Sequence, residues 1–462
     1  MARSSRYEMD MTQGALLPKV LMFSLPLIAS GILQLLFNAA DMVVVGRWAG
    51  KECLAAVGST GSLINLMVNV FIGLSVGGSV AVARAFGAND PVAVHRGVHT
   101  AMTLAIIAGL VVGLVGFIFC RPLLAMMDNP VLDLATTYMK IYFLGMPFNM
   151  IYNFGASILR AVGDTRRPLI YLTIAGVVNV VLNLILVIFF HMTVDGVAIA
   201  TVTSQAVSAV LVVTCLMRST GVVHLDLRDL RIHKREFALI ARVGLPAGLQ
   251  GSLFSISNVL IQSSVNSFGD VVVAANSAGS NLEGFVYTSM NAIHQAALTF
   301  ASQNLGARKL KRIEEGTKQG LIMAAGLSAA ITVILLFLNK FLFGFFTDTA
   351  ELIDLAGRMM RIMAVGYVGV AVTQVLGGVM RGCGDTMTPM WISMISTILL
   401  RIPVAYGMAY LTASAAWPNG HPFSLSTSLL VSWTLGAVIT FVAFRRGKWR
   451  KAVHYADQAA AD

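Results

Sequence analysis

Long apolar runs alternate with short polar segments along the whole chain. About 20 consecutive apolar residues suffice to cross a bilayer as a helix. Twelve runs reach that length, and they fall at residues 16–46, 54–83, 94–120, 131–159, 168–190, 194–217, 237–268, 271–304, 317–343, 351–380, 388–411 and 424–444. The pattern predicts an all-α polytopic membrane protein with twelve transmembrane helices.

The two halves of the chain repeat one another. RAVGDTRRP at 160–168 matches RGCGDTMTP at 381–389, and LDLATTYMKI at 132–141 matches IDLAGRMMRI at 353–362. All matching segments are separated by nearly the same interval along the chain, which indicates one duplication. Each copy contains six predicted helices, so both copies enter the membrane in the same direction. We therefore expect two six-helix lobes related by a pseudo-twofold axis along the membrane normal, with a substrate cavity between them.

The repeat also predicts the domain boundaries. The first lobe is expected to occupy residues 1–218 and the second 237–446. A basic, amphipathic linker at 219–236 joins them on the cytoplasmic surface, and residues 447–462 form a cytoplasmic tail. Within the first lobe, Gly73 and Gly77 have the small-xxx-small spacing that is typical of close helix packing.

The distribution of charge predicts the orientation of the chain in the membrane. Charged residues make up 12% of the chain, against about 25% in soluble domains. Of the 33 Lys and Arg residues, 25 lie in the terminal segments and the turns on one side of the predicted membrane. Basic residues accumulate on the cytoplasmic side, so both termini are predicted to be cytoplasmic in a multi-pass protein of the inner membrane. The net charge of +11 is thus a topology signal, and nucleic-acid binding is not expected.

No pattern points to an enzyme. The four cysteines are scattered, and there is no P-loop, no HExxH and no nucleophile paired with a base. A membrane-embedded acyltransferase or peptidase would need such a pair. We expect no catalytic residue, no metal and no cofactor, and we expect an ion gradient to supply the energy.

Asp41 is the outstanding polar residue of the first apolar run. A carboxylate at membrane depth costs roughly 2.5–3.5 kcal/mol on insertion scales, so such residues are rare and usually functional. Gln34, Asn38 and Asp41 stand at positions i, i+4 and i+7, on one face of a helix. That face is predicted to look into a cavity, because lipid cannot solvate it.

Two later spans carry polar pairs at helical spacing. Asn179 and Asn183 are spaced i, i+4 on the fifth predicted span, and Thr201 and Gln205 repeat that spacing on the sixth. Burial disfavours the charged form of a carboxyl group, so a buried Asp41 could bind and release a proton near neutral pH. We predict that Asp41 couples transport to the ion gradient.

A second polar stripe follows the eighth predicted span. It contains Glu283 and Tyr287, and an arginine, Arg401, lies within the eleventh span. An unpaired arginine inside the membrane is costly, so we predict that Glu283 and Arg401 are ion-pair partners. Whether Glu283 also takes part in coupling stays open. These residues, with Gln34, Asn38, Asn153 and Gln205, are predicted to line the substrate cavity.

The chain resembles the MATE (multidrug and toxic compound extrusion) family over about residues 15–445. The similarity lies in the duplicated six-helix layout, the paired GDT turns and two further motifs, NVVLN at 179–183 and GVAIATVTSQ at 196–205. The resemblance implies that Asp41 matches the first-span acid of the DinF-like branch, which is implicated in proton coupling. It also implies that Asn179, Asn183 and Thr201 line the cavity of the first lobe.

The chain departs from the family pattern at two places. Many DinF-like members have an acid where this chain has Asn183, so Asp41 would act alone. The sodium-coupled NorM-like branch has a glutamate in the seventh span, where this chain reads GLQGSLFSIS without an acid. A cation site of that type is therefore not expected in the second lobe.

Together these observations predict a secondary active antiporter that works by alternating access. It would export organic cations, drugs or amphipathic metabolites in exchange for protons, with sodium as the alternative ion, and we expect it to be a monomer. A flippase for lipid-linked oligosaccharides is the alternative within the same superfamily. Such flippases usually have a more cationic central cavity, whereas the intramembrane charges here are few and mixed.

Overall fold

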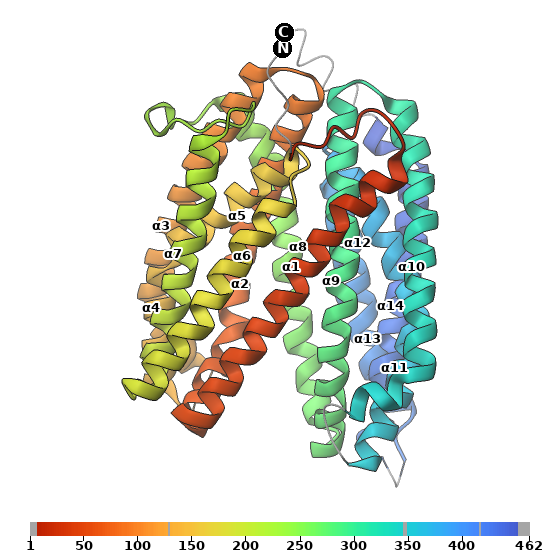
Figure 1. Ribbon diagram of the computed structural model, residues 1–462. Coiled ribbons are helices and arrows are strands. Elements are labelled where there is room, and N and C mark those ends of the chain that lie inside the picture. Colours follow the sequence, from red (N-terminus) through yellow and green to blue (C-terminus); the bar gives the residue numbers. More distant parts are fainter. Residues whose placement is uncertain (1–6, 128–129, 345–348, 415–416, 451–462) are drawn as a thin grey trace. The chain divides into compact units, whose positions relative to one another are not determined.

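The fold of the chain is described from a computed structural model that covers residues 7–127, 130–344, 349–414 and 417–450. Within these residues the chain is helical and contains no strand (Figure 1). In chain order, the helices are α1 Leu16–Val44, α2 Lys51–Gly87, α3 Pro91–Met126, α4 Leu132–Leu144, α5 Met146–Ala161, α6 Arg166–Leu184, α7 Val194–Arg218, α8 Lys234–Asn266, α9 Asp270–Gly306, α10 Leu310–Gly344, α11 Ala350–Gly382, α12 Met387–Met394, α13 Arg401–Leu411 and α14 Phe423–Arg445. Short π-helical segments extend α1 and α6 and join α12 to α13.

The helices correspond to the twelve predicted spans. Ten segments of the described chain are long and apolar enough to cross a membrane by length and composition. The other two predicted spans are α4 with α5, which are separate helices of 13 and 16 residues, and α9, which has 37 residues. The fourth span is divided because Pro147, near the start of α5, has no N–H to donate to the preceding turn. The all-α, twelve-helix fold is confirmed.

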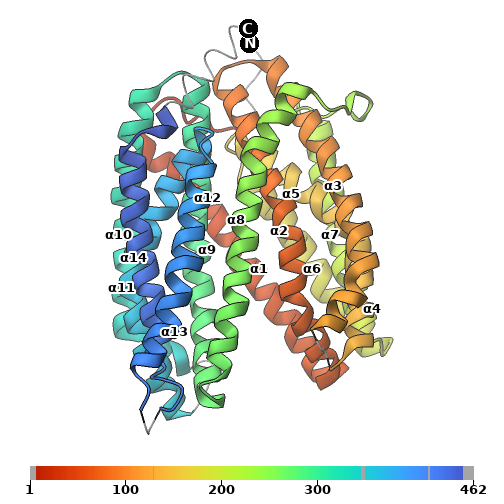
Figure 2. The same cartoon turned by 180° about the vertical axis from the view of Figure 1, so that it is seen from behind.

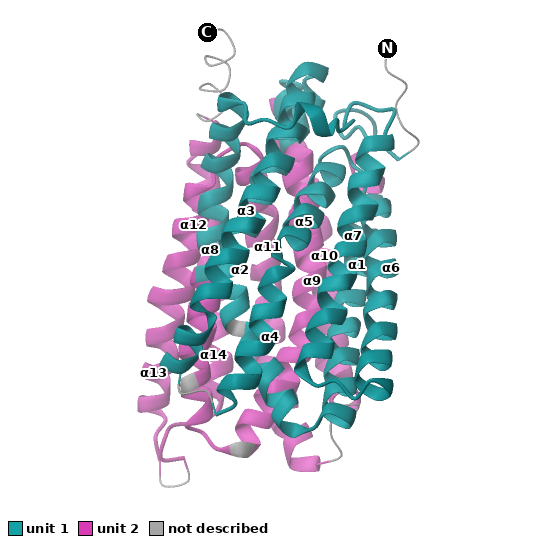
Figure 3. Cartoon of the chain, turned by 90° about the vertical axis from the view of Figure 1, so that its left-hand side faces the viewer, with its two compact units in different colours: residues 1–14, 21–252, 302–308 teal, residues 15–20, 253–301, 309–462 magenta. Residues whose placement is uncertain are grey.

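Contacts between residues divide the chain into two compact units (Figure 3). Unit 1 comprises residues 1–14, 21–252 and 302–308, and unit 2 comprises 15–20, 253–301 and 309–462. The predicted linker 219–236 lies within unit 1, and the division between the units falls inside α8. In unit 1, α2 packs against α3 and α5, and α7 against α4, α5 and α6; Figure 2 shows these helices from behind. In unit 2, α11 packs against both α10 and α14.

The duplication is visible in the backbone. Asn89 and Arg308, which occupy matching positions of the two copies, both have positive φ, at 53° and 56°. Gly163 and Gly384 occupy matching positions of the two GDT turns and have φ of 89° and 93°. Glycine adopts such a left-handed conformation without strain, and this explains why both turns carry it. The repeated sequence therefore specifies the same turn twice.

In the first GDT turn, Asp164 caps α6. Its Oδ1 accepts hydrogen bonds from the backbone N–H groups of Arg166 and Arg167, at 3.2 and 3.1 Å. Its other oxygen forms an ion pair with the Arg167 guanidinium. In the second turn, Asp385 Oδ1 accepts from Thr388 N at 3.2 Å. Both acids thus satisfy N–H groups that have no partner within the helix, which is a structural role.

The linker of unit 1 is fastened to α3. The backbone N–H of Asp226 donates to Nε2 of the buried His99 at 3.0 Å, and that of His233 donates to Thr100 Oγ1 at 3.1 Å. Burial and the nearby Arg231 guanidinium lower the pKa of His233. The ring is therefore neutral at pH 7, and its Nε2 can accept the 3.0 Å hydrogen bond from Arg231 Nε. Side chains of α3 thus hold the linker by its backbone.

Replacing Thr100 with Val is expected to loosen the linker without disturbing the helices. The change removes, at nearly constant volume, the hydroxyl that accepts from His233 N and also lies 3.2 Å from His233 Nδ1. Each such hydrogen bond contributes about 1 kcal/mol. Amide hydrogen exchange over residues 224–233 should therefore become at least roughly 5-fold faster. Thr103→Val is the matched control, because the Thr103 hydroxyl donates within α3, to His99 O. Equal exchange in both variants would contradict this attachment.

Candidate functional site

Asp41 lies in the last turn of α1 and is partly buried. Its carboxylate is surrounded by amide donors from α6. Asn183 Nδ2 donates to Asp41 Oδ1 at 2.5 Å. The amide of Asn179, oriented from its hydrogen-bond network, donates to Oδ1 at 2.7 Å and to Oδ2 at 3.1 Å. Three hydrogen bonds thus stabilise an ionised carboxylate in an apolar helix bundle.

The predicted neighbours on α7 lie at different distances from the acid. The Asn179 amide atom that points away from Asp41 lies 3.5 Å from Thr201 Oγ1. The Thr201 hydroxyl donates to Val197 O at 3.0 Å. Gln205 lies beside Tyr142 of α4 and has no contact with Asp41 among the described residues. The structure therefore brings Asp41, Asn179, Asn183 and Thr201 together, and it leaves Gln205 outside this cluster.

Tyr138 of α4 also belongs to the surroundings of Asp41. It is buried, and it is close enough to interact electrostatically with the carboxylate. The sequence offers no signal for it, because a tyrosine in an apolar span is indistinguishable from a packing residue.

Three other predicted residues do not join the Asp41 cluster. Gln34 and Asn38 are exposed, and they make no hydrogen bond with any residue that the structure describes. Asn153 bonds within α5, where its Nδ2 donates to the backbone and side-chain oxygens of Asn149 at 2.9 and 3.0 Å. Their place in a substrate cavity stays a prediction.

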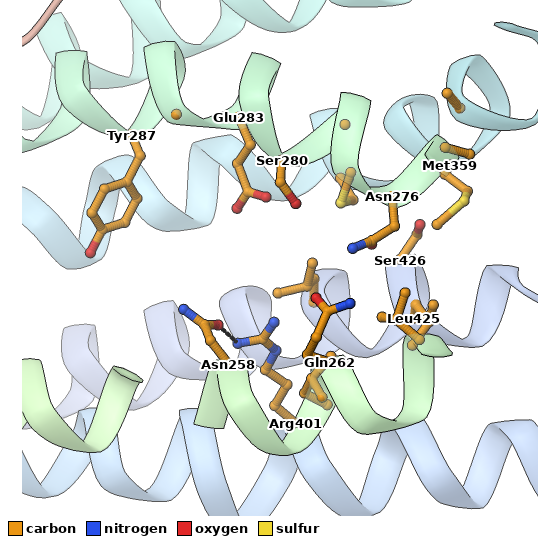
Figure 4. Close-up of a pocket in the computed structure, with 18 of the residues that line it drawn as sticks. Asn258, Gln262, Asn276, Ser280, Glu283, Tyr287, Met359, Arg401, Leu425 and Ser426 are labelled. Atoms are coloured by element: carbon orange, nitrogen blue, oxygen red, sulfur yellow. Dashed lines mark hydrogen bonds between the residues drawn. The ribbon is translucent and has the colours of Figure 1, made fainter. Parts of the chain in front are cut away.

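Unit 2 contains a pocket of about 360 Å³ lined by charged, polar and aromatic side chains (Figure 4). Glu283 projects into it from α9 and Arg401 from α13. Asn258 and Gln262 of α8 lie next to Arg401, and Asn276 of α9 lies opposite Gln262. Three helices thus turn polar groups toward one space.

The predicted direct ion pair between Glu283 and Arg401 does not form, although the two charges interact electrostatically. Within the described residues no nitrogen of Arg401 lies within 4.0 Å of a Glu283 oxygen, and Arg401 Nη1 instead donates to Asn258 Oδ1 at 2.8 Å. Figure 4 shows the two charged groups on opposite walls of the pocket. The sequence placed both charges in the same region but could not show that Asn258 holds the guanidinium on its own side.

One wall of the pocket is aromatic. Tyr287, predicted from the polar stripe, stacks on Phe254 of α8 with ring centroids 5.9 Å apart. Trp433, Met359 and Met363 also line the pocket. Asn258, Gln262 and Phe254 were not predicted from the sequence. The i, i+4 spacing of Asn258 and Gln262 within an apolar span was the available signal.

A separate group of His95, His99 and Asp229 has ligand atoms within 4.8 Å of one another. Both ring nitrogens of His99 are already engaged, since Nδ1 contacts His95 O at 2.7 Å and Nε2 accepts from Asp226 N. A metal ion would have to break the attachment of the linker. This group therefore fits a structural role better than a metal site.

Comparison with known proteins identifies the family. The family model described as MatE matches the chain twice, over residues 26–185 and 246–407. The two matches together cover more than half of the chain, and they fall on the two copies of the sequence repeat. This chain belongs to the MATE family.

Relatives of this MATE chain are named for different substrates. The probable multidrug resistance protein YoeA of Bacillus subtilis (strain 168) is 26% identical over 422 residues, which is 89% of this chain and 91% of that protein. The FAD transporter of Shewanella oneidensis is 24% identical over 382 residues, covering 81% of this chain and 84% of that protein. A solved structure of a multidrug resistance MATE family transporter in an outward-facing conformation has a TM-score of 0.87 and 20% identity, covering 98% and 99% of the two chains.

These comparisons establish a multi-pass membrane protein of a transporter family. Multidrug efflux proteins are among its relatives. Within the MATE family, membership of the DinF-like branch stays a prediction.

Proposed function

We propose that this MATE protein is a proton-coupled antiporter in which Asp41 is the coupling residue. The observation that carries the proposal is the set of three amide hydrogen bonds on one partly buried carboxylate. A structural acid is commonly fixed by a cation or by backbone N–H groups at a helix start, as Asp164 and Asp385 are. Asp41 has asparagine amides instead, and they can serve both of its protonation states.

The amide of Asn179 supplies the response to protonation. While Asp41 is ionised, the Asn179 nitrogen donates to it. Once Asp41 is protonated, one carboxyl oxygen becomes a donor and requires an acceptor. Rotation of the Asn179 amide then presents its oxygen to Asp41 and its nitrogen to Thr201 Oγ1, 3.5 Å away. Proton binding therefore rearranges contacts between α1, α6 and α7, and this change can favour one conformation of the transporter over another.

The available energy depends on the substrate's charge. One proton gains about 2.3 kcal/mol from a potential of 100 mV and about 1.4 kcal/mol from one unit of pH gradient. For export of a neutral or zwitterionic molecule the sum supports a gradient of about 500-fold. For a monovalent cation the electrical term cancels in one-for-one exchange, and only about 10-fold remains. Either gradient allows net export of the substrate against its concentration.

The substrates are proposed to be drugs, organic cations or amphipathic metabolites. The relatives include proteins named for multidrug resistance and one named for FAD, so membership of the family leaves the substrate open. We further propose that the protein is a monomer in the cytoplasmic membrane with both termini in the cytoplasm, and that it uses no cofactor.

The coupling ion is tested with purified protein in liposomes. We expect a fluorescent organic cation to accumulate when a proton gradient is imposed and to remain near equilibrium when only a sodium gradient is imposed. Release of internal protons should follow addition of substrate. Accumulation driven by sodium alone would contradict proton coupling, and the absence of accumulation under either gradient would contradict antiport.

A further inference from the structure

The pocket of unit 2 presents two opposite charges that do not pair with each other. The Glu283 carboxylate makes no hydrogen bond and no direct ion pair with any residue that the structure describes, and it interacts with the Arg401 guanidinium only electrostatically, from beyond 4.0 Å. The guanidinium of Arg401 is bound only at Nη1, by Asn258, and its buried Nε has no hydrogen-bond partner among the described residues. The Arg401 residue is only 8% exposed. Both groups are thus available to a ligand.

Two buried charges without direct partners raise the free energy of the folded protein while the pocket is empty. A buried charge without a full set of hydrogen bonds loses solvation that the protein does not replace. Direct contact between Glu283 and Arg401 would relieve the cost, yet Asn258 holds the guanidinium on the opposite wall (Figure 4). A ligand with one positive and one negative group would satisfy both walls at once.

The remaining lining favours an aromatic body with further polar groups. Phe254 and Tyr287 stack and offer an aromatic surface, and Met359 gives an adaptable one. At the end of the pocket away from Tyr287, Asn276 lies close to Ser426, whose buried hydroxyl has no partner among the described residues. The volume of about 360 Å³ is within the range of small-molecule sites, which is roughly 300–1,000 Å³.

We propose that this pocket binds aromatic zwitterions, with an ammonium group at Glu283 and a carboxylate or phosphate at Arg401. As a statement about transported molecules the proposal rests on the proposed function, but binding itself does not require an ion gradient. A molecule with only a positive charge would satisfy Glu283 and leave Arg401 unpaired, and one with only a negative charge would do the reverse. Discrimination therefore comes from the unpaired partner as much as from the contacts formed.

The proposal is tested with three probes that share the indole ring. L-Tryptophan is the zwitterion, tryptamine the cation and indole-3-propionate the anion. Titration calorimetry on the purified full-length protein, without any gradient, is expected to show at least 10-fold tighter binding of tryptophan than of either other probe. Equal affinities for tryptophan and tryptamine, or no binding of tryptophan at millimolar concentration, would overturn the proposal.

Substitutions assign each charge. Glu283→Gln should weaken tryptophan and tryptamine at least 10-fold and should tighten indole-3-propionate, because the unpaired carboxylate is gone. Arg401→Gln should weaken tryptophan and indole-3-propionate. Arg401→Lys retains the charge and should recover part of the affinity for tryptophan. Should Arg401→Gln fold poorly, Arg401→Lys and Glu283→Gln still test the assignment. Arg401→Lys should weaken mainly indole-3-propionate, and Glu283→Gln should weaken mainly tryptamine. If the two variants affected these two probes alike, the assignment would be refuted.

A matched control removes an acid outside the pocket. Glu351→Gln changes an exposed carboxylate at the start of α11 and should bind all three probes as the unaltered protein does. Asp41→Asn should also retain tryptophan binding, because Asp41 lies in unit 1. Loss of proton-driven transport with retained binding in Asp41→Asn would support both proposals. Retained transport would contradict only the coupling role, and unselective binding would contradict only the zwitterion site.

Discussion

Asp41→Asn is expected to reduce proton-driven transport to the level of liposomes without protein. Asparagine has nearly the same shape as aspartate and can still bond to Asn179 and Asn183, but it cannot take up a proton. The protein should therefore fold and bind substrate while losing the response of the Asn179 amide to pH. Uptake of a fluorescent organic cation under an imposed pH gradient measures the loss.

Two variants show whether the effect is specific. Glu52→Gln removes an exposed acid in the first turn of α2 and should transport normally. Asp41→Glu keeps a titratable group and should retain part of the activity. Exchange of labelled for unlabelled substrate without a gradient should survive in Asp41→Asn, since it needs binding but no coupling. Undiminished uptake by Asp41→Asn would contradict the coupling role of Asp41. If Glu283→Gln at the same time lost gradient-driven uptake but kept exchange without a gradient, the coupling role would move to unit 2.

Gly73→Ala in α2 is expected to be strongly destabilising. A Cβ at Gly73 would lie 2.2 Å from Gly248 N and 2.4 Å from Gly248 Cα in the segment of α8 that belongs to unit 1. Both are backbone atoms, so the helices must separate to admit the methyl group. Overpacking of this kind costs about 1–3 kcal/mol or more. The melting temperature in detergent should fall by several degrees, and aggregation on size-exclusion chromatography should increase.

The same helix provides the control. No atom lies within 4 Å of a Cβ built at Gly61, so Gly61→Ala should be neutral, or stabilising by up to about 1 kcal/mol because alanine favours the helix. Gly77→Ala should resemble Gly73→Ala, since its Cβ would lie 2.2 Å from Ile240 O. The double variant should cost less than the sum, because one separation of the helices accommodates both methyl groups. A Gly73→Ala protein as stable as Gly61→Ala would show that the contact between α2 and α8 is loose.

The spacing of small residues predicted close packing at Gly73 and Gly77, and the structure confirms it. The sequence could not identify the partner helix, because a small-residue pattern predicts only that some other helix packs closely at these positions. The GDT turns show the same limit. An aspartate directly before a helix often caps it, whereas the pairing of Asp164 with Arg167 follows from side-chain directions in the folded turn.

By itself, the sequence determined the membrane-spanning helices, the duplication and the acid in the first span. It could do so because membrane insertion depends on the composition of each segment and because the repeat is a property of the chain. Helical spacing placed Asn179 and Asn183 on one face of their span, and the family resemblance indicated that this face lies beside Asp41. Only the tertiary structure decided that Arg401 bonds to Asn258 and leaves Glu283 unpaired. That choice depends on which helices border the pocket and on a hydrogen bond between residues 143 positions apart, and no local pattern encodes it.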